Sequence, residues 1–232
     1  MKRNIQRILI WALIIALFPL AAQEHLYSPQ GVAQKSKDIF DKMESFSSRF
    51  TINTVDGNRS RTMSGICYFQ KPSKIRFEFS DPPGNLIVSD GHLLWVYISR
   101  LRIAGKQDLR LEIKNENDQP IFSDSPETGL ARLFRKYHYR FDSEDQPRQE
   151  DGGKYFVLDM VQREKIGGYE TIKLYIDAAT YLIHKAVAAD SYGKKTTITF
   201  QNPASDVAVQ GSLFQYQPDE SVRVVNNPLV NE

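Results

Sequence analysis

Between Gly65 and Ser99 the sequence alternates apolar and polar residues in four short runs, and each run stops at a group of strand-breaking residues. In the second run, three apolar residues alternate with Arg76 and Glu78. This period of two predicts an antiparallel sheet. The predicted strands are Ile66–Gln70, Lys74–Ser80, Leu86–Ser89 and Leu93–Ile98, connected by Lys71-Pro72, Pro82-Pro83-Gly84-Asn85 and the hairpin pair Asp90-Gly91.

The predicted strands carry large apolar side chains at every second position, which predicts one strongly apolar sheet face. Such a face has to close on itself, pack against another layer or hold a ligand. The sequence leaves open whether this face is a filled core or the wall of a cavity. The residues expected on it are Ile75, Phe77, Phe79, Leu86, Val88, Leu93, Trp95 and Tyr97.

Two amphipathic helices are predicted to form the second layer. Ser28-Pro29 is a helix-start signal, and one apolar stripe follows it at helical spacing: Val32, Ile39, Phe40, Met43 and Phe46. The second helix is capped by Ser125, begins at Pro126 and has the apolar stripe Leu130, Leu133, Phe134 and Tyr137. The first helix is either an ordinary packed helix or a lid over the sheet.

The remainder of the chain has the same strand rhythm, with polar loops at 115–124 and 143–153. There is no internal repeat and no change of composition that suggests a second domain. We therefore expect a mainly β (α+β) protein, with one domain over residues 23–232 and about ten or eleven antiparallel strands. The further strands predicted are Ser48–Val55, Arg59–Met63, a hairpin of Arg100–Ile103 and Leu109–Ile113 around Ala104-Gly105-Lys106, Tyr155–Val161, Tyr169–Ile176, Leu182–Ala189, Thr196–Gln201, Leu213–Gln217 and Val222–Val225.

Residues 1–22 have the pattern of a cleavable export signal. A basic start is followed by the apolar run Ile8–Leu17 and by small residues before Gln23, and the run is shorter than the ~20 residues that a membrane span needs. Losing Lys2, Arg3 and Arg7 changes the formal net charge from +2 to −1, so nothing favours a nucleic-acid partner. The single cysteine, Cys67, is expected to be a buried strand residue. The expected product is a soluble protein exported across a membrane.

The sequence contains no recognisable catalytic or metal-binding motif. The four histidines are scattered, and there is no nucleophile elbow, phosphate-binding loop or zinc-binding helix motif. We therefore expect a protein that is not an enzyme and that needs no metal and no cofactor.

The block from Phe69 to Tyr97, FQKPSKIRFEFSDPPGNLIVSDGHLLWVY, strongly resembles the LolA family of periplasmic lipoprotein carriers. The likeness extends from the first helix to the closing hairpin Phe214–Val224. The resemblance implies an unclosed antiparallel β-barrel with helices as a lid over an apolar cavity. It also implies a monomeric chaperone that receives acylated lipoproteins from an inner-membrane lipoprotein-releasing transporter and delivers them to an outer-membrane acceptor.

The resemblance also implies which residues contact the acyl chains. The candidates on the strands are Ile75, Phe77, Phe79, Val88, Trp95 and Tyr97, and those on the helices are Ile39, Phe40, Met43, Leu130, Leu133 and Phe134. Several carriers have an arginine before the proline that is thought to tie the lid closed. This chain has Lys71 there, a less directional hydrogen-bond donor, as the candidate lid latch.

Two other functions fit the same scaffold: a periplasmic carrier or sensor of free lipid or glycolipid, and a membrane-anchored acceptor. The acceptor would need a lipid-modified cysteine at the mature N-terminus, and Leu20–Glu24 contains none. A Phe77→Glu variant is expected to lose cargo binding if Phe77 lines a cavity, and to unfold if Phe77 belongs to a solid core.

Overall fold

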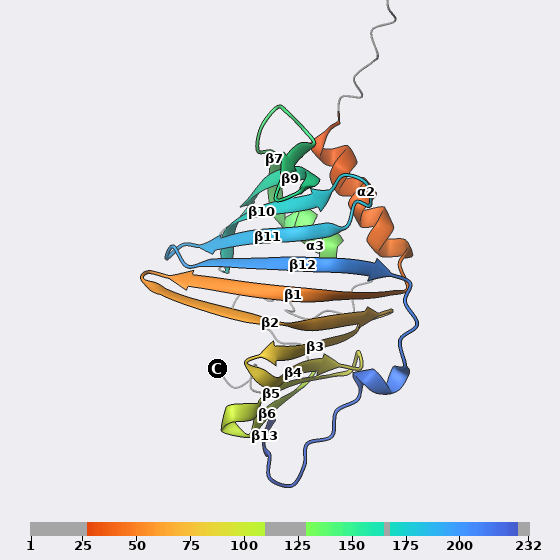
Figure 1. Cartoon of the computed structure of the whole chain (residues 1–232), viewed down its shortest axis with the longest axis vertical. Helices are drawn as coiled ribbons and strands as arrows, with labels where there is room; N and C mark the ends of the chain where they lie inside the picture. The colour runs from red at the N-terminus through yellow and green to blue at the C-terminus, as the bar shows by residue number, and fades with distance from the viewer. Residues whose placement is uncertain (1–26, 110–128, 165–167, 227–232) are drawn as a thin grey trace, which may run out of the picture.

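A computed structural model describes residues 27–109, 129–164 and 168–226, and in this part of the chain the strands form one thirteen-stranded sheet (Figure 1). The order is β13-β6-β5-β4-β3-β2-β1-β12-β11-β10-β9-β7, and β8 also pairs with β9. The strands are β1 (Ser45–Asp56), β2 (Arg59–Gln70), β3 (Lys74–Asp81), β4 (Pro83–Ser89), β5 (Leu93–Ile98), β6 (Ile103–Asp108), β7 (Tyr137–Phe141), β8 (Arg148–Glu150), β9 (Gly153–Gln162), β10 (Tyr169–Asp177), β11 (Ile183–Asp190), β12 (Lys195–Ser205) and β13 (Arg223–Asn226).

The sheet curves but does not close, because its two ends, β13 and β7, do not pair with each other. The long strands β1, β2 and β12 form its middle and join an N-terminal run of hairpins to a C-terminal run (Figure 1). The predicted fold class, an unclosed and mainly antiparallel β-barrel with helices, is confirmed. The domain boundaries stay a prediction, and the export signal lies outside the described residues.

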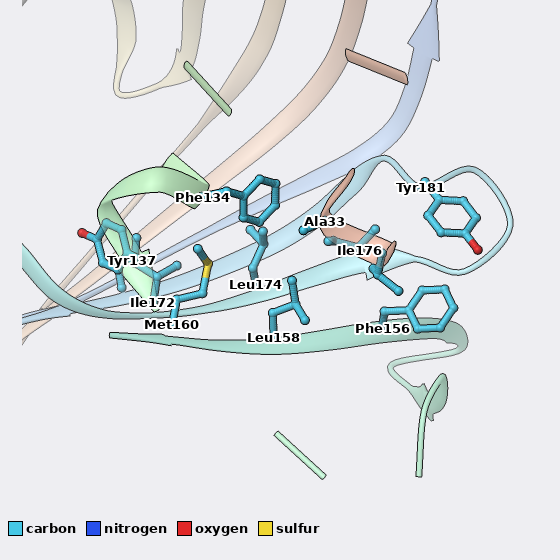
Figure 2. Packing of buried hydrophobic residues seen from close by; sticks show 12 residues of the cluster. Ala33, Phe134, Tyr137, Phe156, Leu158, Met160, Ile172, Leu174, Ile176 and Tyr181 are labelled. Carbon is cyan, nitrogen blue, oxygen red and sulfur yellow. The ribbon is translucent and has the colours of Figure 1, made fainter. Parts of the chain in front are cut away.

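Helix α2 (Pro29–Lys42) begins where the sequence predicts. The Ser28 hydroxyl accepts a hydrogen bond from the Gly31 amide at 3.0 Å and caps the helix. Helix α3 (Gly129–Lys136) also forms, although its predicted start at Ser125 and Pro126 lies outside the described residues. Both helices pack on the concave face of the sheet over β7, β9, β10 and β11 (Figure 2). We call this packed layer the helix-covered core; its buried members are Val32, Ala33, Phe134, Tyr137, Phe156, Leu158, Met160, Ile172, Leu174, Ile176, Tyr181 and Ala188.

A second buried cluster, the phenylalanine core, lies under the end of α2 on β1, β2 and β3. At its centre, Phe50 is only 1% exposed, and its ring meets those of Phe77 and Phe79 at centroid distances of 5.3 and 5.2 Å. Cys67 is buried in the same cluster as predicted, and burial raises the pKa of its thiol to about 11, so it stays protonated. The buried members are Met43, Phe46, Phe50, Cys67, Phe79 and Leu182.

The structure corrects several predicted elements. The prediction of a hairpin turn at Ala104-Gly105-Lys106 is wrong, because these residues pair with β5 and lie inside β6. Most of the predicted second strand of that hairpin, residues 110–113, lies outside the described residues. Leu213–Gln217 is not a strand, since Gly211–Phe214 forms a 3₁₀ helix. The last strand, β13, runs parallel to β6 rather than antiparallel to a neighbour.

The strand number is also higher than the ten or eleven expected, mainly because two edge strands were missed. Tyr137, assigned to the second helix, begins β7 instead, and its hydroxyl donates to the Tyr169 carbonyl oxygen at 2.6 Å. The segment 143–153, expected to be a loop, contains the short strand β8. Pairing with β9 organises both segments, and such tertiary pairing is invisible to local sequence patterns.

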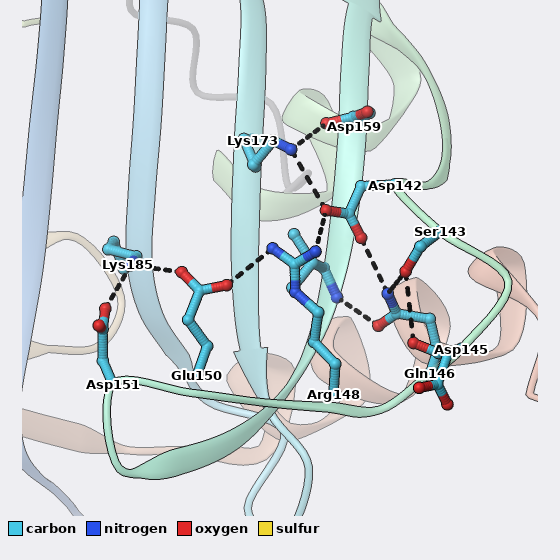
Figure 3. A network of polar contacts seen from close by, with 11 residues as sticks. Asp142, Ser143, Asp145, Gln146, Arg148, Glu150, Asp151, Asp159, Lys173 and Lys185 are labelled. Atoms are coloured by element: carbon cyan, nitrogen blue, oxygen red, sulfur yellow. Dashed lines mark hydrogen bonds and ion pairs between the residues drawn. The ribbon is translucent and has the colours of Figure 1, made fainter.

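Opposite the helix-covered core, the convex face of β9, β10 and β11 carries a network of ion pairs (Figure 3). The Arg148 guanidinium lies between two carboxylates, at 2.7 Å from Asp142 Oδ2 and 2.7 Å from Glu150 Oε2. Lys185 Nζ reaches Glu150 Oε1 at 3.1 Å. Burial alone would raise the pKa of Glu150, but hydrogen bonds from Lys185 and Arg148 outweigh this and hold that pKa below its usual 4.5.

We expect this network to make the fold sensitive to acid. Because the pKa of Glu150 is lower in the folded protein, its contribution to stability is present above pH 4.5 and is lost as the pH falls below that value. Urea unfolding between about pH 7 and about pH 3 measures the effect. Glu150→Gln should lower stability at neutral pH and flatten the acid limb, and an unchanged pH profile in this variant would contradict the assignment.

Candidate functional site

The helices leave part of the concave face uncovered, at the end of the sheet where β2 begins and β5 ends. There the structure has an open groove with a volume of about 660 Å³, within the ~300–1,000 Å³ typical of small-molecule sites. Its walls come from four neighbouring strands and from the 3₁₀ helix Ser99–Leu101. We call it the lower groove; the apolar side chains that line it from the concave face are Met63, Phe79, Ile87, Val96 and Ile98, with Leu101 at its edge.

Apolar side chains in the lower groove are unusually accessible. Val96 is 39% exposed, Ile98 40% and Leu101 50%, although the first two lie on the inner face of a strand. Phe79 connects the groove to the phenylalanine core, where it is 8% exposed. The groove is therefore an apolar surface that continues into a filled core, and not a polar cleft with converging catalytic groups.

Three predicted contact residues on β3 lie on this concave face. Phe77 pairs with Ile87 of β4, and both pack against the phenylalanine core together with Phe79. Ile75 is at the same phase of the strand, two positions before Phe77, and lies opposite Ser89. Met43, the residue directly after α2, is buried in the phenylalanine core, and Ile39 and Phe40 of α2 pack against it.

The prediction that Leu86, Val88, Leu93, Trp95 and Tyr97 share this face is wrong. Val88 pairs with Arg76 and with Trp95, so these residues have the opposite phase to Phe77 and Ile87 and lie on the convex face. Val88 is fully buried there. Tyr97 borders the lower groove, but its ring lies on the convex side, 5.8 Å from the Tyr216 ring and tilted against it. A shift of one residue in strand register moves every side chain to the other face.

The C-terminal segment covers these convex-face residues. The Tyr216 ring lies 5.5 Å from that of Trp95, and Phe214 is 2% exposed. Arg76 Nη1 donates to the Leu213 carbonyl oxygen at 2.9 Å and holds the 3₁₀ helix against β3. The aromatic side chains of β5 are therefore part of a second packed layer on the outside of the sheet.

The predicted residues on α3 belong to the helix-covered core. Phe134 is 8% exposed and its ring lies 5.3 Å from that of Tyr139, while Leu130 and Leu133 pack against the same core. A second hollow, with a volume of about 570 Å³, lies between α2 and α3, and Phe134 and Tyr139 contribute to it. The predicted contact residues of α3 therefore lie together in the helix-covered core, and none of them lines the lower groove.

Lys71, the predicted latch, does contact α2. Its Nζ donates to the Asp41 carbonyl oxygen at 2.7 Å and lies 3.0 Å from Glu44 Oε1, just beyond the helix end. Its backbone amide donates to the Glu44 carbonyl oxygen at 2.9 Å. A cation is favoured here because the last carbonyls of a helix lack partners and carry its negative dipole end. That Lys71 controls opening of a lid stays a prediction.

We expect Lys71→Met to loosen the C-terminal turn of α2. A hydrogen bond to a charged group is worth about 1.5 kcal/mol or more, so amide hydrogen exchange in residues 39–42 should become about tenfold faster. Lys71→Arg keeps the donor and should stay close to the original rate. Equal exchange in the Lys71→Met and unchanged proteins would show that apolar contacts alone hold the helix.

The groove residues that the sequence interpretation missed are Met63, Ile87, Val96, Ile98 and Leu101. In Leu93–Ile98 every residue is apolar, so the alternation that marks an inward face is absent there. Among the described residues, no three His, Cys, Asp or Glu side chains gather where they could hold a metal ion. Within the same ranges, no helix is both long and apolar enough to cross a membrane.

Comparison with known proteins identifies a family. Residues 41–217 match the family described as outer membrane lipoprotein carrier protein LolA. An outer-membrane lipoprotein carrier protein from Nitrosomonas europaea is 25% identical over 196 residues, covering 82% of this chain and 87% of that protein. One of the same name from Methylococcus capsulatus is 25% identical over 202 residues, covering 81% and 84%.

A solved structure supports the fold alone. The crystal structure of an uncharacterized conserved protein from Thermus thermophilus aligns with a TM-score of 0.55 at 14% identity. The alignment covers 84% of this chain and 98% of that chain.

Proposed function

Because this chain belongs to the LolA family of outer-membrane lipoprotein carriers, we propose that it binds the acyl chains of lipoproteins released from the inner membrane and carries them to the outer membrane. The family is a binding and chaperone family, and the proposed role needs no chemical step. The observation that carries the proposal is the lower groove, where Val96, Ile98 and Leu101 remain accessible beside a large apolar core.

The physical problem for such a carrier is the hydrophobicity of its cargo. Each buried CH₂ group is worth ~0.8 kcal/mol, so a sixteen-carbon chain represents on the order of 12 kcal/mol that has to be shielded during transfer through water. The side chains that line the groove from the concave face, among them Ile87, Val96 and Ile98, offer apolar contact. Dispersion and hydrophobic contacts do not require one fixed pose, so they allow both capture and release.

We propose two levels of contact. The first is the accessible groove around Phe79, Ile87 and Val96. The second becomes available when the helices lift from the sheet, an opening that Lys71 restrains as the latch. The side chains proposed for this second level are Ile39, Phe40, Met43, Ile75, Phe77, Leu130, Leu133 and Phe134.

The cellular setting follows as part of the same proposal. The export signal in residues 1–22 would place the mature protein in the periplasm. The protein would act there as a monomer. It would receive cargo from an inner-membrane lipoprotein-releasing transporter and pass it to an outer-membrane lipoprotein acceptor.

The experiment is a release assay with inner-membrane vesicles that contain a triacylated lipoprotein and the releasing transporter. Adding the purified protein with ATP should move the lipoprotein into the supernatant in a one-to-one complex. Bovine serum albumin, which also binds acyl chains, is the control for non-specific extraction. Failure with each native lipoprotein tested would contradict the proposal.

A further inference from the structure

The rim of the lower groove carries three exposed charged side chains, and two of them are arginines. Arg61 extends from β2 on the same face as Met63, while Arg100 belongs to the 3₁₀ helix that closes the groove. Asp81, at the end of β3, supplies the third charge. The rim therefore has one more positive than negative charge at the point where the apolar wall meets water.

Within the described residues, neither rim arginine makes a side-chain contact that holds the fold together. In the described part of the chain, no carboxylate, hydroxyl or carbonyl group bonds to the side chain of Arg61 or Arg100, and Asp81 pairs with neither. Other arginines behave differently: Arg76 pairs with Glu78 at 3.1 Å, and Arg148 is held between carboxylates. Two unpaired guanidinium groups beside exposed Val96 and Ile98 form an amphipathic site, with an apolar floor and a cationic rim.

This combination matches one class of ligand. A guanidinium group is planar and presents a fork of donors that fits the oxygens of a phosphate group. An acyl chain lying on Val96 and Ile98 would bring a headgroup attached to its end to the rim. The lipid part of an acylated lipoprotein carries no phosphate. The rim arginines would therefore have no phosphate to bind in that cargo.

We infer that the lower groove also takes single anionic phospholipid molecules, with the phosphate against Arg61 and Arg100 and an acyl chain on the groove floor. The inference rests on the proposed function, because it requires the groove to hold an acyl chain. It adds a second ligand, selected by its headgroup. Asp81 weakens this selection because its carboxylate repels the phosphate.

The test compares two ligands that share an acyl chain: palmitoyl lysophosphatidylglycerol, which has a phosphate, and monopalmitoylglycerol, which has none. Both are titrated below their critical micelle concentrations against the protein loaded with a naphthyl fluorophore that reports apolar binding. Lysophosphatidylglycerol should bind about tenfold more tightly, as expected for charge-assisted hydrogen bonds at an exposed rim. Added salt should reduce this preference and leave the affinity for monopalmitoylglycerol unchanged.

Substitutions at the rim test whether its charged side chains cause the preference for lysophosphatidylglycerol. The double variant Arg61→Gln/Arg100→Gln should bind both ligands with the affinity of monopalmitoylglycerol, whereas Asp81→Asn should bind lysophosphatidylglycerol more tightly. Arg49→Gln is the matched control, since Arg49 is exposed on β1 at a position of convex-face phase. A preference that persists in the double variant, or equal binding of both ligands to the unchanged protein, would overturn the inference and leave the proposed function standing. Absence of binding by both ligands would overturn the acyl-chain groove and the inference with it.

Discussion

Val96→Glu is expected to abolish acyl-chain binding while leaving the protein folded. Val96 pairs with Ile87 and Gly105 on the concave face and is already 39% exposed, so a carboxylate there can remain hydrated in the empty protein. An acyl chain that enters the groove would displace that water and leave the charge without a partner. Such desolvation costs about 2 kcal/mol or more, which corresponds to a loss of affinity well above tenfold.

Fluorophore displacement and the vesicle release assay both measure this effect. The matched control is Val161→Glu, which places the same charge at a 54% exposed valine on the convex phase of β9. Both variants should unfold at the same urea concentration as the unchanged protein. If Val96→Glu still carried cargo, the lower groove would not be the binding surface.

This design is sharper than the Phe77→Glu test that the sequence alone suggests. The Phe77 ring contacts that of Phe50 and packs against the phenylalanine core, so a charge there would disturb the fold and the binding surface together. Loss of binding in that variant would have two explanations. Val96 separates them because its side chain borders the groove and contributes little to the core.

Phe50→Ala is expected to have the largest effect on stability. Phe50 is 1% exposed and its ring contacts both Phe77 and Phe79, so its removal leaves a cavity at the centre of the phenylalanine core. Truncating a buried phenylalanine costs about 3–5 kcal/mol, through lost burial and the cavity that remains. Urea unfolding should show a lower midpoint with an unchanged slope.

Tyr192→Ala is the control for this substitution, since Tyr192 is an aromatic residue with 93% exposure in the turn between β11 and β12. Its free energy of unfolding should stay within about 0.5 kcal/mol of the original value. Equal effects of the two substitutions would contradict the assignment of Phe50 to the centre of the core. Because β3 forms one wall of the lower groove, we also expect Phe50→Ala to weaken binding.

Local sequence signals were sufficient to predict an element correctly where the residues of that element alone determine its structure. The Ser28-Pro29 cap predicted the start of α2, and Leu93–Ile98 was predicted with the bounds of β5. Alternation in Lys74–Ser80 assigned Ile75, Phe77 and Phe79 to one face, and the structure places them on the concave side. These predictions succeed because helix caps and the two-residue period are local properties.

Predictions failed where pairing between distant segments decides the outcome. Ala104 and Gly105 resemble a turn, yet β5 pairs with them and makes them part of β6. The C-terminal segment was expected to form a closing hairpin, but Phe214 and Tyr216 instead cover the outside of the sheet. Neither arrangement leaves a pattern inside the segment concerned.

The residue pattern alone was enough to establish the mainly β class, the two amphipathic helices and the alternating strands of a LolA-like carrier. The packed fold was needed to establish which apolar residues face the cargo side. Alternation defines two faces within one strand, but the phase between neighbouring strands depends on turns, bulges and pairing. In β4 and β5, where both faces are apolar, that phase sent Val88, Trp95 and Tyr97 outward and left Ile87, Val96 and Ile98 to line the groove.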